Sequence, residues 1–412
     1  MYNAATIQDE FITLVGWRKD DDPSATLNPY GDLLTSDSGL YFNDECALLT
    51  MDTIMSIAPK FSTFTYSAWA SGTTYAKGDI VTSGGNYYVS VVNANTNHAV
   101  NLTAYWRQTT PASEWLRNKT QGGIIKAVND VLALKFERKT ALNLLSNKTV
   151  LTAPGIDTEL VGDTADFLCW RIVPSNLGGI VFSVDRIALQ MQGSQSVTVK
   201  LWKNGSDTHI ESVTVAGDGT SDVIWVDAGW ELEPGNFYYI GFDRSGLTAT
   251  PINSIANVDR YAWAYNRFPG TLPYAEVAAF NHAGPGNDGW DDVSSIVTNQ
   301  NSYGINISMT ARCDYTQFII DHKMLFKTVI AKRVAIDMLR ELMINPNARI
   351  NRNEANMDPL AIKIEIDGHP NGRKAGLSLE YEQALKTITF DQRSLNKECL
   401  PCKKDGITIG AA

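Results

Sequence analysis

The sequence has few cysteines, no long apolar run and no secretory leader pattern. It contains no run of roughly 18 apolar residues, so we expect no membrane-spanning helix. The first residues, MYNAATIQDEF, lack a basic and an apolar region, which favours folding in a reducing cytoplasm. The 5 cysteines in 412 residues are sparse and odd in number, which does not indicate a disulfide framework.

The motifs of common enzyme classes are also missing. The chain contains no Walker loop, no G-x-G-x-x-G after a predicted strand, no G-x-S-x-G, no H-E-x-x-H and no kinase signature. A pair of carboxylates for glycoside hydrolysis remains open, because the sequence singles out no pair. We therefore predict that the protein is not an enzyme and uses no cofactor.

Three groups of residues have the composition of a metal or redox site without completing one. Cys399 and Cys402 have zinc or redox spacing, but no second ligand pair accompanies them, so we favour a structural terminal segment. The acidic loops 20–22 and 287–292 offer oxygen ligands for Ca²⁺ but match no EF-hand loop. Asp321-His322 has no Ser or Cys nucleophile signature nearby and is interpreted as a solvated pair. We predict no bound metal.

The charge is uneven along the chain. Residues 1–313 hold 20 Lys and Arg against 32 Asp and Glu, a net −12, whereas residues 314–412 hold 15 against 13, a net +2. Because DNA affinity depends on neutralising phosphates, most of the chain should repel nucleic acid.

Hydrophobic periodicity predicts helices at both ends of the chain. The first helix is capped by Thr6, a second runs from about 43 to 58, and a third runs from 111 towards Leu145. The spacing of apolar residues in the segment 315–344 predicts one long helix there. The pattern alternates at 360–367 and 384–391, which predicts a strand pair near the C-terminus.

Between the helices the pattern has period two. Strands are expected within 66–108, with a Ser-Gly-Gly-Asn hairpin turn at 83–86, and throughout 150–313, with turns about every ten residues. Such short alternating strands indicate a sandwich of jelly-roll type. The stretch 254–300 has a looser pattern.

The predicted fold is therefore an α+β multidomain chain with five parts. They are a helical base (1–65 and 109–149), an inserted small β-module (66–108), a jelly-roll-like antiparallel β-sandwich (150–313), a C-terminal helix that packs on the base (314–345), and a C-terminal β-hairpin or arm (346–412).

The segment 315–344 carries an apolar stripe that is wider than one helix face. A helix of this kind is covered on more than one side, either by the N-terminal helices or by a neighbouring subunit. We therefore consider the stripe as a candidate oligomer interface; its residues are Phe318, Leu325, Val329, Ile336 and Leu339.

The small β-module resembles carbohydrate-binding modules of the chitin-binding type (families 5 and 12). The resemblance rests on Trp69, Tyr75-x-x-Gly78-Asp79-x-Val81, Gly85-x-x-Tyr88 and Trp106. It implies carbohydrate binding by Trp69, Tyr75, Tyr87, Tyr88 and Trp106. Val91 and Val92 stand where chitin-binding members often carry a Trp pair. The alternative, which we favour, is that Trp69, Tyr75, Tyr88 and Trp106 form the module's own small core.

Three further stretches resemble virion proteins of crAss-like phages that infect Bacteroidetes. They are Ala311-Arg-Cys-Asp-Tyr315, Asn345-Pro-Asn-Ala-Arg-Ile-Asn351 and Cys399-Leu-Pro-Cys-Lys403; the predicted strand 167–174 (FLCWRIVP) fits the same group. The resemblance implies a structural subunit of the virion, made in the host cytoplasm, that forms a homo-oligomeric ring in the neck or tail.

The partners implied are the portal or further ring proteins, with genomic DNA passing through the lumen without sequence-specific binding. The alternative is a glycan-binding adhesin, or receptor-binding tail protein, that uses the aromatic module on a surface glycan. A ring subunit should assemble at high concentration, whereas a lectin should stay small and bind glycans.

Overall fold

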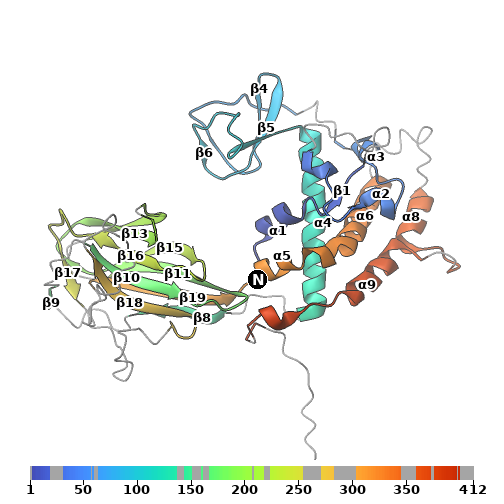
Figure 1. The fold of residues 1–412 in the computed structure, drawn as a ribbon. Helices are drawn as coiled ribbons and strands as arrows, with labels where there is room; N and C mark the ends of the chain where they lie inside the picture. Colours follow the sequence, from blue (N-terminus) through green and yellow to red (C-terminus); the bar gives the residue numbers. More distant parts are fainter. Residues whose placement is uncertain are drawn as a thin grey trace, which may run out of the picture. The chain divides into compact units, whose positions relative to one another are not determined.

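The structure is a computed structural model whose chain forms two compact units (Figure 1). The helical unit comprises Tyr2–Lys139 and Thr316–Asp391, and the sandwich unit comprises Thr140–Tyr315 and Gln392–Ala412. The predicted α+β multidomain class is confirmed. The residues that the structure describes are 2–18, 31–56, 58–59, 64–136, 143–150, 159–160, 167–206, 208–217, 223–253, 271–282, 303–344, 359–372, 375–396 and 398–399.

The helical unit is built from two chain segments, one that precedes the sandwich in the sequence and one that follows it. Its elements before the sandwich are α1 (Ala4–Phe11), β1 (Val15–Gly16), η1 (Gly31–Leu34), β2 (Leu40–Tyr41), α2 (Phe42–Glu45), α3 (Met51–Ser56) and α4 (Pro111–Phe136). Its elements after the sandwich are α5 (Thr316–Asp321), η5 (Lys323–Phe326), α6 (Lys327–Ile344), α8 (Pro359–Asp367) and α9 (Leu377–Thr387).

Helix α6 is the centre of this unit. It packs against α2, α4, α8 and α9, which is why its apolar surface extends around most of the helix. A cluster of aromatic rings lies beside its N-terminal end, with edge or tilted ring contacts at centroid distances of 5.4–6.0 Å; its members are Phe11, Phe136, Phe318, Phe326 and Phe390. The burial of these large rings supplies much of the driving force for this unit.

One ion triad ties α6 to two neighbouring helices. Lys332 Nζ lies 2.7 Å from a carboxylate oxygen of Glu45 in α2 and 2.7 Å from one of Glu380 in α9. Burial by itself lowers the pKa of Lys332, but the hydrogen bonds to Glu380 and Glu45 outweigh it, and the net shift of the pKa is upward. The ammonium therefore stays charged inside the unit.

The predicted boundaries of the helices need several corrections. Helix α1 begins before Thr6, because the side chain of Asn3 accepts hydrogen bonds from the backbone of Ala5 and Thr6 and caps the helix. The helix expected at 43–58 is two short helices, α2 and α3, and the helix expected at 315–344 is divided into α5, η5 and α6. Helix α4 ends at Phe136, and Leu145 lies in a strand of the sandwich.

The predicted C-terminal strand pair is wrong. Residues 360–367 lie in α8, and residues 384–387 form the end of α9, whereas 388–391 lie beyond the helix and form no strand. The alternating apolar residues of 360–367 fit a strand, but Ile362 and Ile366 are also four residues apart, and these two are the buried ones. Helical spacing therefore puts one face of α8 against α6, and tertiary packing overrides the strand preference of isoleucine.

The inserted module consists of short strands. They are β3 (Thr74–Tyr75), β4 (Ile80–Ser83), β5 (Asn86–Ser90), β6 (Asn95–Thr96) and β7 (Trp106–Thr109), in sheets ordered β3-β6 and β4-β5-β7. Of these strands, β4, β5 and β6 are labelled in Figure 1. The predicted hairpin turn is confirmed, because Ser83 pairs with Asn86 and both Gly84 and Gly85 have positive φ, 57° and 81°. A two-residue turn of this kind requires such φ values, which glycine adopts without strain.

The described part of the sandwich unit contains two large antiparallel sheets. One has the order β8-β19-β11-β15 and the other β14-β13-β16-β10-β18. Their bounds are β8 (Asn143–Thr149), β10 (Phe167–Pro174), β11 (Ile180–Leu189), β13 (Ser196–Lys203), β14 (Glu211–Ala216), β15 (Ile224–Leu232), β16 (Tyr238–Asp243), β18 (Ala275–His282) and β19 (Ile305–Cys313). A small third sheet has the order β12-β17-β9, with bounds Met191–Gln192, Thr250–Asn253 and Glu159–Leu160.

This strand order is the jelly roll that the sequence predicts. With β18 set aside as an added edge strand, the other eight strands of these two sheets can be numbered 1 to 8 in chain order. One sheet then has the spatial order 1-8-3-6 and the other the order 2-7-4-5, which is the jelly-roll arrangement. Strand β18 falls in the stretch 254–300, whose looser pattern did not delimit a strand. Strand β10 is buried on both faces: Leu168 and Trp170 lie on one, and Phe167 and Cys169 belong to a cluster with Trp202 and Tyr239 on the other.

Two of the four cysteines that the structure describes are paired, which their number and spacing did not indicate. Cys313 at the end of β19 and Cys399 form a disulfide across 86 residues of sequence, with their Cα atoms 5.6 Å apart. Cys399 is therefore not a metal or redox partner of Cys402, which lies outside the described residues.

The segment around Cys399 is bound to the sandwich by more than the disulfide. Asn396 N donates to the carbonyl of Gly178 at 2.8 Å, and Tyr315 Oη donates to the carbonyl of Cys399 at 2.7 Å. A Cβ on Gly178 would lie 1.8 Å from the carbonyl oxygen of Ser394, so only glycine permits this approach. The chain thus leaves the sandwich unit after Tyr315. Where it returns to that unit, the disulfide and the hydrogen bonds at Asn396 and Cys399 hold it in place.

A buried tyrosine predicts that the helical unit is sensitive to alkaline pH. Tyr381 Oη donates to Asp130 Oδ2 at 2.7 Å. Burial, and then the hydrogen bond to Asp130, raise the pKa of Tyr381 far above its ordinary value of 10.0. As the pH rises past that ordinary value, an unfolded chain loses the phenolic proton while the folded chain keeps it, so the free energy of unfolding should fall.

The measurement is urea unfolding at several pH values between about 8 and 11, a range that spans the ordinary pKa of tyrosine. Tyr381→Phe should have a shallower alkaline decline than the wild type, whereas Tyr88→Phe in the module should not change it. Equal slopes for the wild type and Tyr381→Phe would contradict the prediction.

Candidate functional site

The module's aromatic residues are divided between its core and its surface. Tyr75 is 7% exposed and Trp106 is 1% exposed, and both pack with Val81. Their ring centroids are 5.2 Å apart in an edge-to-face contact. Trp69 and Tyr88 are partly exposed and pack against this cluster. The interpretation of these aromatics as a small core is confirmed, and the ring faces of Tyr75 and Trp106 are not open to a ligand.

The polar atoms of the two core aromatics are also used inside the module. Trp106 Nε1 donates to the carbonyl of His98 at 2.9 Å, and Tyr75 Oη accepts from the backbone N–H of Ala70 at 2.8 Å. These bonds satisfy the only polar groups that the two rings carry, as burial requires. Both residues therefore serve the fold of the module.

Tyr87 is the predicted carbohydrate residue that lies outside this core cluster. It is partly exposed and meets Tyr66 edge to face, with centroids 5.5 Å apart. Burial, and then the neighbouring Tyr87, raise the pKa of Tyr66. Sequence reasoning missed Tyr66, because it precedes the motif. Val91 and Val92, which stand in the place of the missing Trp pair, are partly exposed.

The candidate oligomer stripe is mostly inside the helical unit. Phe318, Val329, Ile336 and Leu339 are buried, and the helices packed against α6 include α2 and α4 from the N-terminal half of the chain. The sequence left open whether the N-terminal helices or a neighbouring subunit cover this stripe. The structure shows that the N-terminal helices do. Leu325 is the exception, because it is 43% exposed and follows Met324, which is 46% exposed.

Asp321 and His322 do not form the solvated pair that the sequence suggested. Asp321 is exposed and accepts a hydrogen bond from Gln317. His322 is half-buried and packs against the rings of Phe318 and Phe390, with its Nδ1 2.8 Å from the carbonyl oxygen of Phe318. The two side chains thus lie in different environments, and His322 belongs to the aromatic cluster. The two acidic loops considered for Ca²⁺ fall outside the described residues.

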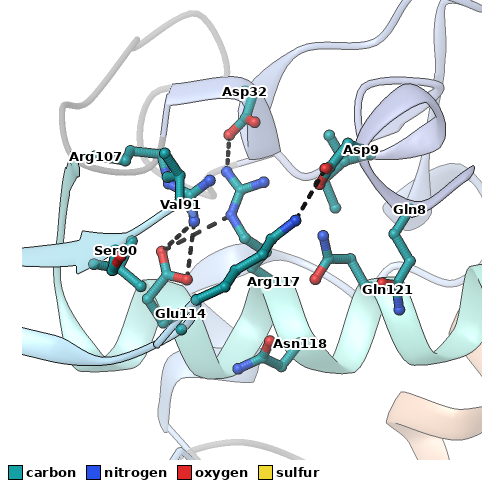
Figure 2. A pocket seen from close by; sticks show the side chains of 14 residues that line it. Gln8, Asp9, Asp32, Ser90, Val91, Arg107, Glu114, Arg117, Asn118 and Gln121 are labelled. Carbon is teal, nitrogen blue, oxygen red and sulfur yellow. Dashed lines mark hydrogen bonds and ion pairs between the residues drawn. The ribbon is translucent and has the colours of Figure 1, made fainter. Parts of the chain in front are cut away.

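The helical unit also contains a polar cavity that the sequence did not predict. Its volume is about 410 Å³, and the module, α1, η1 and α4 contribute its walls (Figure 2). We call it the polar cavity; it is lined by Gln8, Asp9, Ile12, Asp32, Lys77, Gly78, Val89, Ser90, Val91, Arg107, Glu114, Arg117, Asn118 and Gln121. Four separate chain segments meet here, so no local motif could have identified it.

Glu114 is the buried anion of the polar cavity. Its side chain is 9% exposed and accepts two hydrogen bonds from Arg107 Nη2, both at 2.9 Å, and one from Thr109 Oγ1 at 2.7 Å. Arg117, whose side chain is 6% exposed, lies with its Nε 3.9 Å from the same carboxylate and donates through Nη2 to Asp32. Figure 2 shows these side chains converging from β7, α4 and η1.

Across the cavity, the module and α1 are joined by a weaker pair. Lys77 Nζ lies 3.4 Å from Asp9 Oδ2, and both side chains are about half exposed. In water-accessible surroundings such a pair contributes little, roughly 0–1 kcal/mol. The group of Arg107 with the buried Glu114 and Arg117 is therefore the fixed part of the cavity, and Lys77 with Asp9 forms its rim.

Neither a metal site nor a membrane span is found in the described ranges. They contain no group of three or more His, Cys, Asp or Glu residues placed to hold a metal ion. None of their helices is long and apolar enough to span a bilayer. In comparisons with known proteins, no protein-family model, no curated protein and no solved structure matches this chain.

Proposed function

We propose that this chain is a structural subunit of a bacteriophage virion, one of many copies that form a ring in the neck or tail. The observation that carries this proposal is the division of the chain. The helical unit is assembled from Tyr2–Lys139 and Thr316–Asp391, and the sandwich is inserted in the connection between α4 and α5. The β-module is a second insertion, between α3 and α4.

Such a chain suits a repeated assembly. The helical unit has its own core and several ion pairs between its helices, including Lys126 with Asp337 at 2.8 Å and Lys119 with Glu341 at 3.0 Å. A base of this kind can repeat around a ring through one heterologous contact between copies. The inserted β-parts are then available for other partners, the portal or further ring proteins. The phage resemblances of the sequence supply the biological setting.

The charge of the chain fits a ring through which DNA passes without being held. The formal net charge is −10, and DNA binding requires phosphate neutralisation by basic side chains. A lumen formed by such a subunit would not retain the genome by charge. This role requires no catalysis and no cofactor.

Met324 and Leu325 are the residues we would change to test ring formation. They are exposed neighbours in η5, and exposed apolar pairs of this kind are suited to contacts between subunits. Wild-type protein at high concentration should form closed rings by electron microscopy and a large species by mass measurement. Leu325→Glu should shift the population towards monomer, whereas Leu102→Glu, at a similarly exposed position in the module, should not.

A stable monomer or trimer at high concentration, together with absence from purified virions, would contradict the proposal. Recovery of the protein in virions at many copies would support it independently of the purified sample. If the Leu325→Glu variant still formed rings, the contact between subunits would lie elsewhere on the subunit. The proposal of ring formation would not be affected.

The adhesin remains the second candidate, because the partly exposed Tyr66–Tyr87 pair and Trp69 present aromatic surface on the module. Sugars stack on such rings, and aromatic residues dominate the energetics of many binding sites. The adhesin would bind a glycan array, and Tyr87→Ala or Trp69→Ala would reduce the signal. If the protein bound no glycan on the array, the adhesin would be contradicted, and the module would be a structural part of the ring subunit.

A further inference from the structure

We propose that the polar cavity of the helical unit binds a small, uncharged polyhydroxyl compound, such as a sugar or a cyclitol. The volume of about 410 Å³ lies within the range of small-molecule sites, about 300–1,000 Å³. The site is separate from the aromatic face of the module, because none of Trp69, Tyr87 and Tyr88 lines it. The ligand class follows from the charges and the hydrogen-bonding groups of the lining.

The charges of the lining cancel. Its three cations are Lys77, Arg107 and Arg117, and each has an anion of the lining as partner: Asp9, Glu114 and Asp32. A charged ligand would have to break one of these pairs or leave a charge unpaired in a partly buried site, which is costly. An uncharged ligand keeps all three pairs intact.

The lining also has carboxamides that are not used by the fold. The side chains of Gln8 in α1 and of Asn118 and Gln121 in α4 make no hydrogen bond within the described part of the chain, and Figure 2 shows all three in the lining. Each carboxamide offers two donor hydrogens and an acceptor oxygen. A hydroxyl group donates and accepts at once, so a polyhydroxyl compound can satisfy such a set.

Arg117 is a fixed, buried cation of the cavity lining. Its guanidinium is almost fully buried, and its Nε has no hydrogen-bond partner among the described residues. Of its nitrogens, only Nη2 donates a hydrogen bond within the same ranges, to Asp32. Arg117 is therefore held in place by the carboxylates of Asp32 and Glu114, and it forms a rigid part of the lining.

The remaining wall is apolar. Ile12 and Val89 are buried residues of the lining, and Val91 lies beside them in it. Such a wall suits the C–H face of a sugar or cyclitol ring, while the carboxamides meet its hydroxyl groups. The combination of neutral charge, unused amides and an apolar wall is what distinguishes this ligand class from phosphates and from amines.

Calorimetric titration of the full chain with glucose, N-acetylglucosamine and myo-inositol, each alone, tests the proposal, with inorganic phosphate as the charged probe. At least one neutral probe should bind and phosphate should not. The double variant Asn118→Ala/Gln121→Ala should bind that probe roughly tenfold more weakly, because about two hydrogen bonds are lost. Alanine favours the helix at both positions, so this variant should fold.

Two control variants distinguish binding in the cavity from binding elsewhere on the chain. Asn129→Ala changes an exposed asparagine on the same helix, outside the cavity, and should leave the affinity unchanged. Trp69→Ala should also leave it unchanged; loss of binding in this variant would assign the ligand to the aromatic face and overturn the proposal.

Failure of every neutral probe to bind, equal binding by the double variant, or binding of phosphate alone would each overturn the proposal. The cavity would then be a hydrated or anion-binding junction between the module and the helices. None of these results bears on ring formation, which rests on other residues.

Discussion

Alanine at Gly123 is expected to destabilise the helical unit, whereas alanine at the adjacent Gly122 is expected to stabilise it. Both glycines lie inside α4, where replacing glycine by alanine normally adds about 0.5–1 kcal/mol of stability. A Cβ on Gly122 would meet no atom within 4 Å, but a Cβ on Gly123 would lie 2.6 Å from Val334 Cγ2 and 3.3 Å from Val334 Cα. The absence of a side chain at Gly123 thus lets the backbones of α4 and α6 come close together.

The overpacking at Gly123 should cost roughly 1–3 kcal/mol, because the short, branched side chain of Val334 is held inside the core and has little room to turn. Gly123→Val should cost more than Gly123→Ala. Thermal and urea unfolding followed by circular dichroism measure both variants. Because the effects have opposite signs at neighbouring positions, a general effect of helix propensity cannot produce the pattern.

A second change tests whether the contact with Val334 is the cause. Val334→Ala in the Gly123→Ala background should recover part of the lost stability, so the two changes should be non-additive. If alanine stabilised the unit at both glycines, or if Val334→Ala gave no recovery, the close crossing of α4 and α6 would be contradicted.

Loss of the Cys313–Cys399 disulfide is expected to be the other large effect. The bond closes a loop with a sequence separation of 86 residues, for which the chain-entropy estimate is about 4–5 kcal/mol, although measured values are typically about 2–4 kcal/mol. Cys399→Ser should lower the unfolding temperature of the sandwich unit under oxidising conditions. Reduction of the wild-type protein should lower it by a similar amount.

The matched control is Cys46→Ser, which removes a thiol outside the disulfide and should retain the response to reductant. Peptide mapping without reduction should recover the peptides of Cys313 and Cys399 joined. Because cytosolic thiols are kept reduced, we expect the bond to form after the protein meets an oxidising medium. A chain with five reactive thiols under oxidising conditions would contradict the pairing.

Local sequence patterns were sufficient for much of the two β-parts. The Gly84 and Gly85 turn was predictable because a two-residue hairpin requires positive φ at both positions. Most strands of the sandwich were predictable because alternating residues meet different environments on the two faces of a sheet. The jelly-roll class followed from the number and spacing of those strands, whereas β18 was not delimited, because the stretch 254–300 has a looser pattern.

The helical unit shows where local patterns were insufficient. The alternation at 360–367 fits a strand and a helix equally well, and only contact with α6 decides for the helix. The wide stripe of 318–339 correctly indicated cover on several sides, but the sequence could not say whether the cover came from the same chain. The structure places α2 and α4 there, and leaves Leu325 exposed.

The sequence by itself determined the α+β class, the period of most strands and the identity of the module's core aromatics. Each of these depends on neighbours within a few residues, so the information is local. Tertiary structure alone decided the disulfide and the polar cavity. Cys313 meets Cys399 across 86 residues, and the cavity gathers side chains from α1, η1, the module and α4. Contacts between distant segments depend on how the whole chain packs, which no local pattern records.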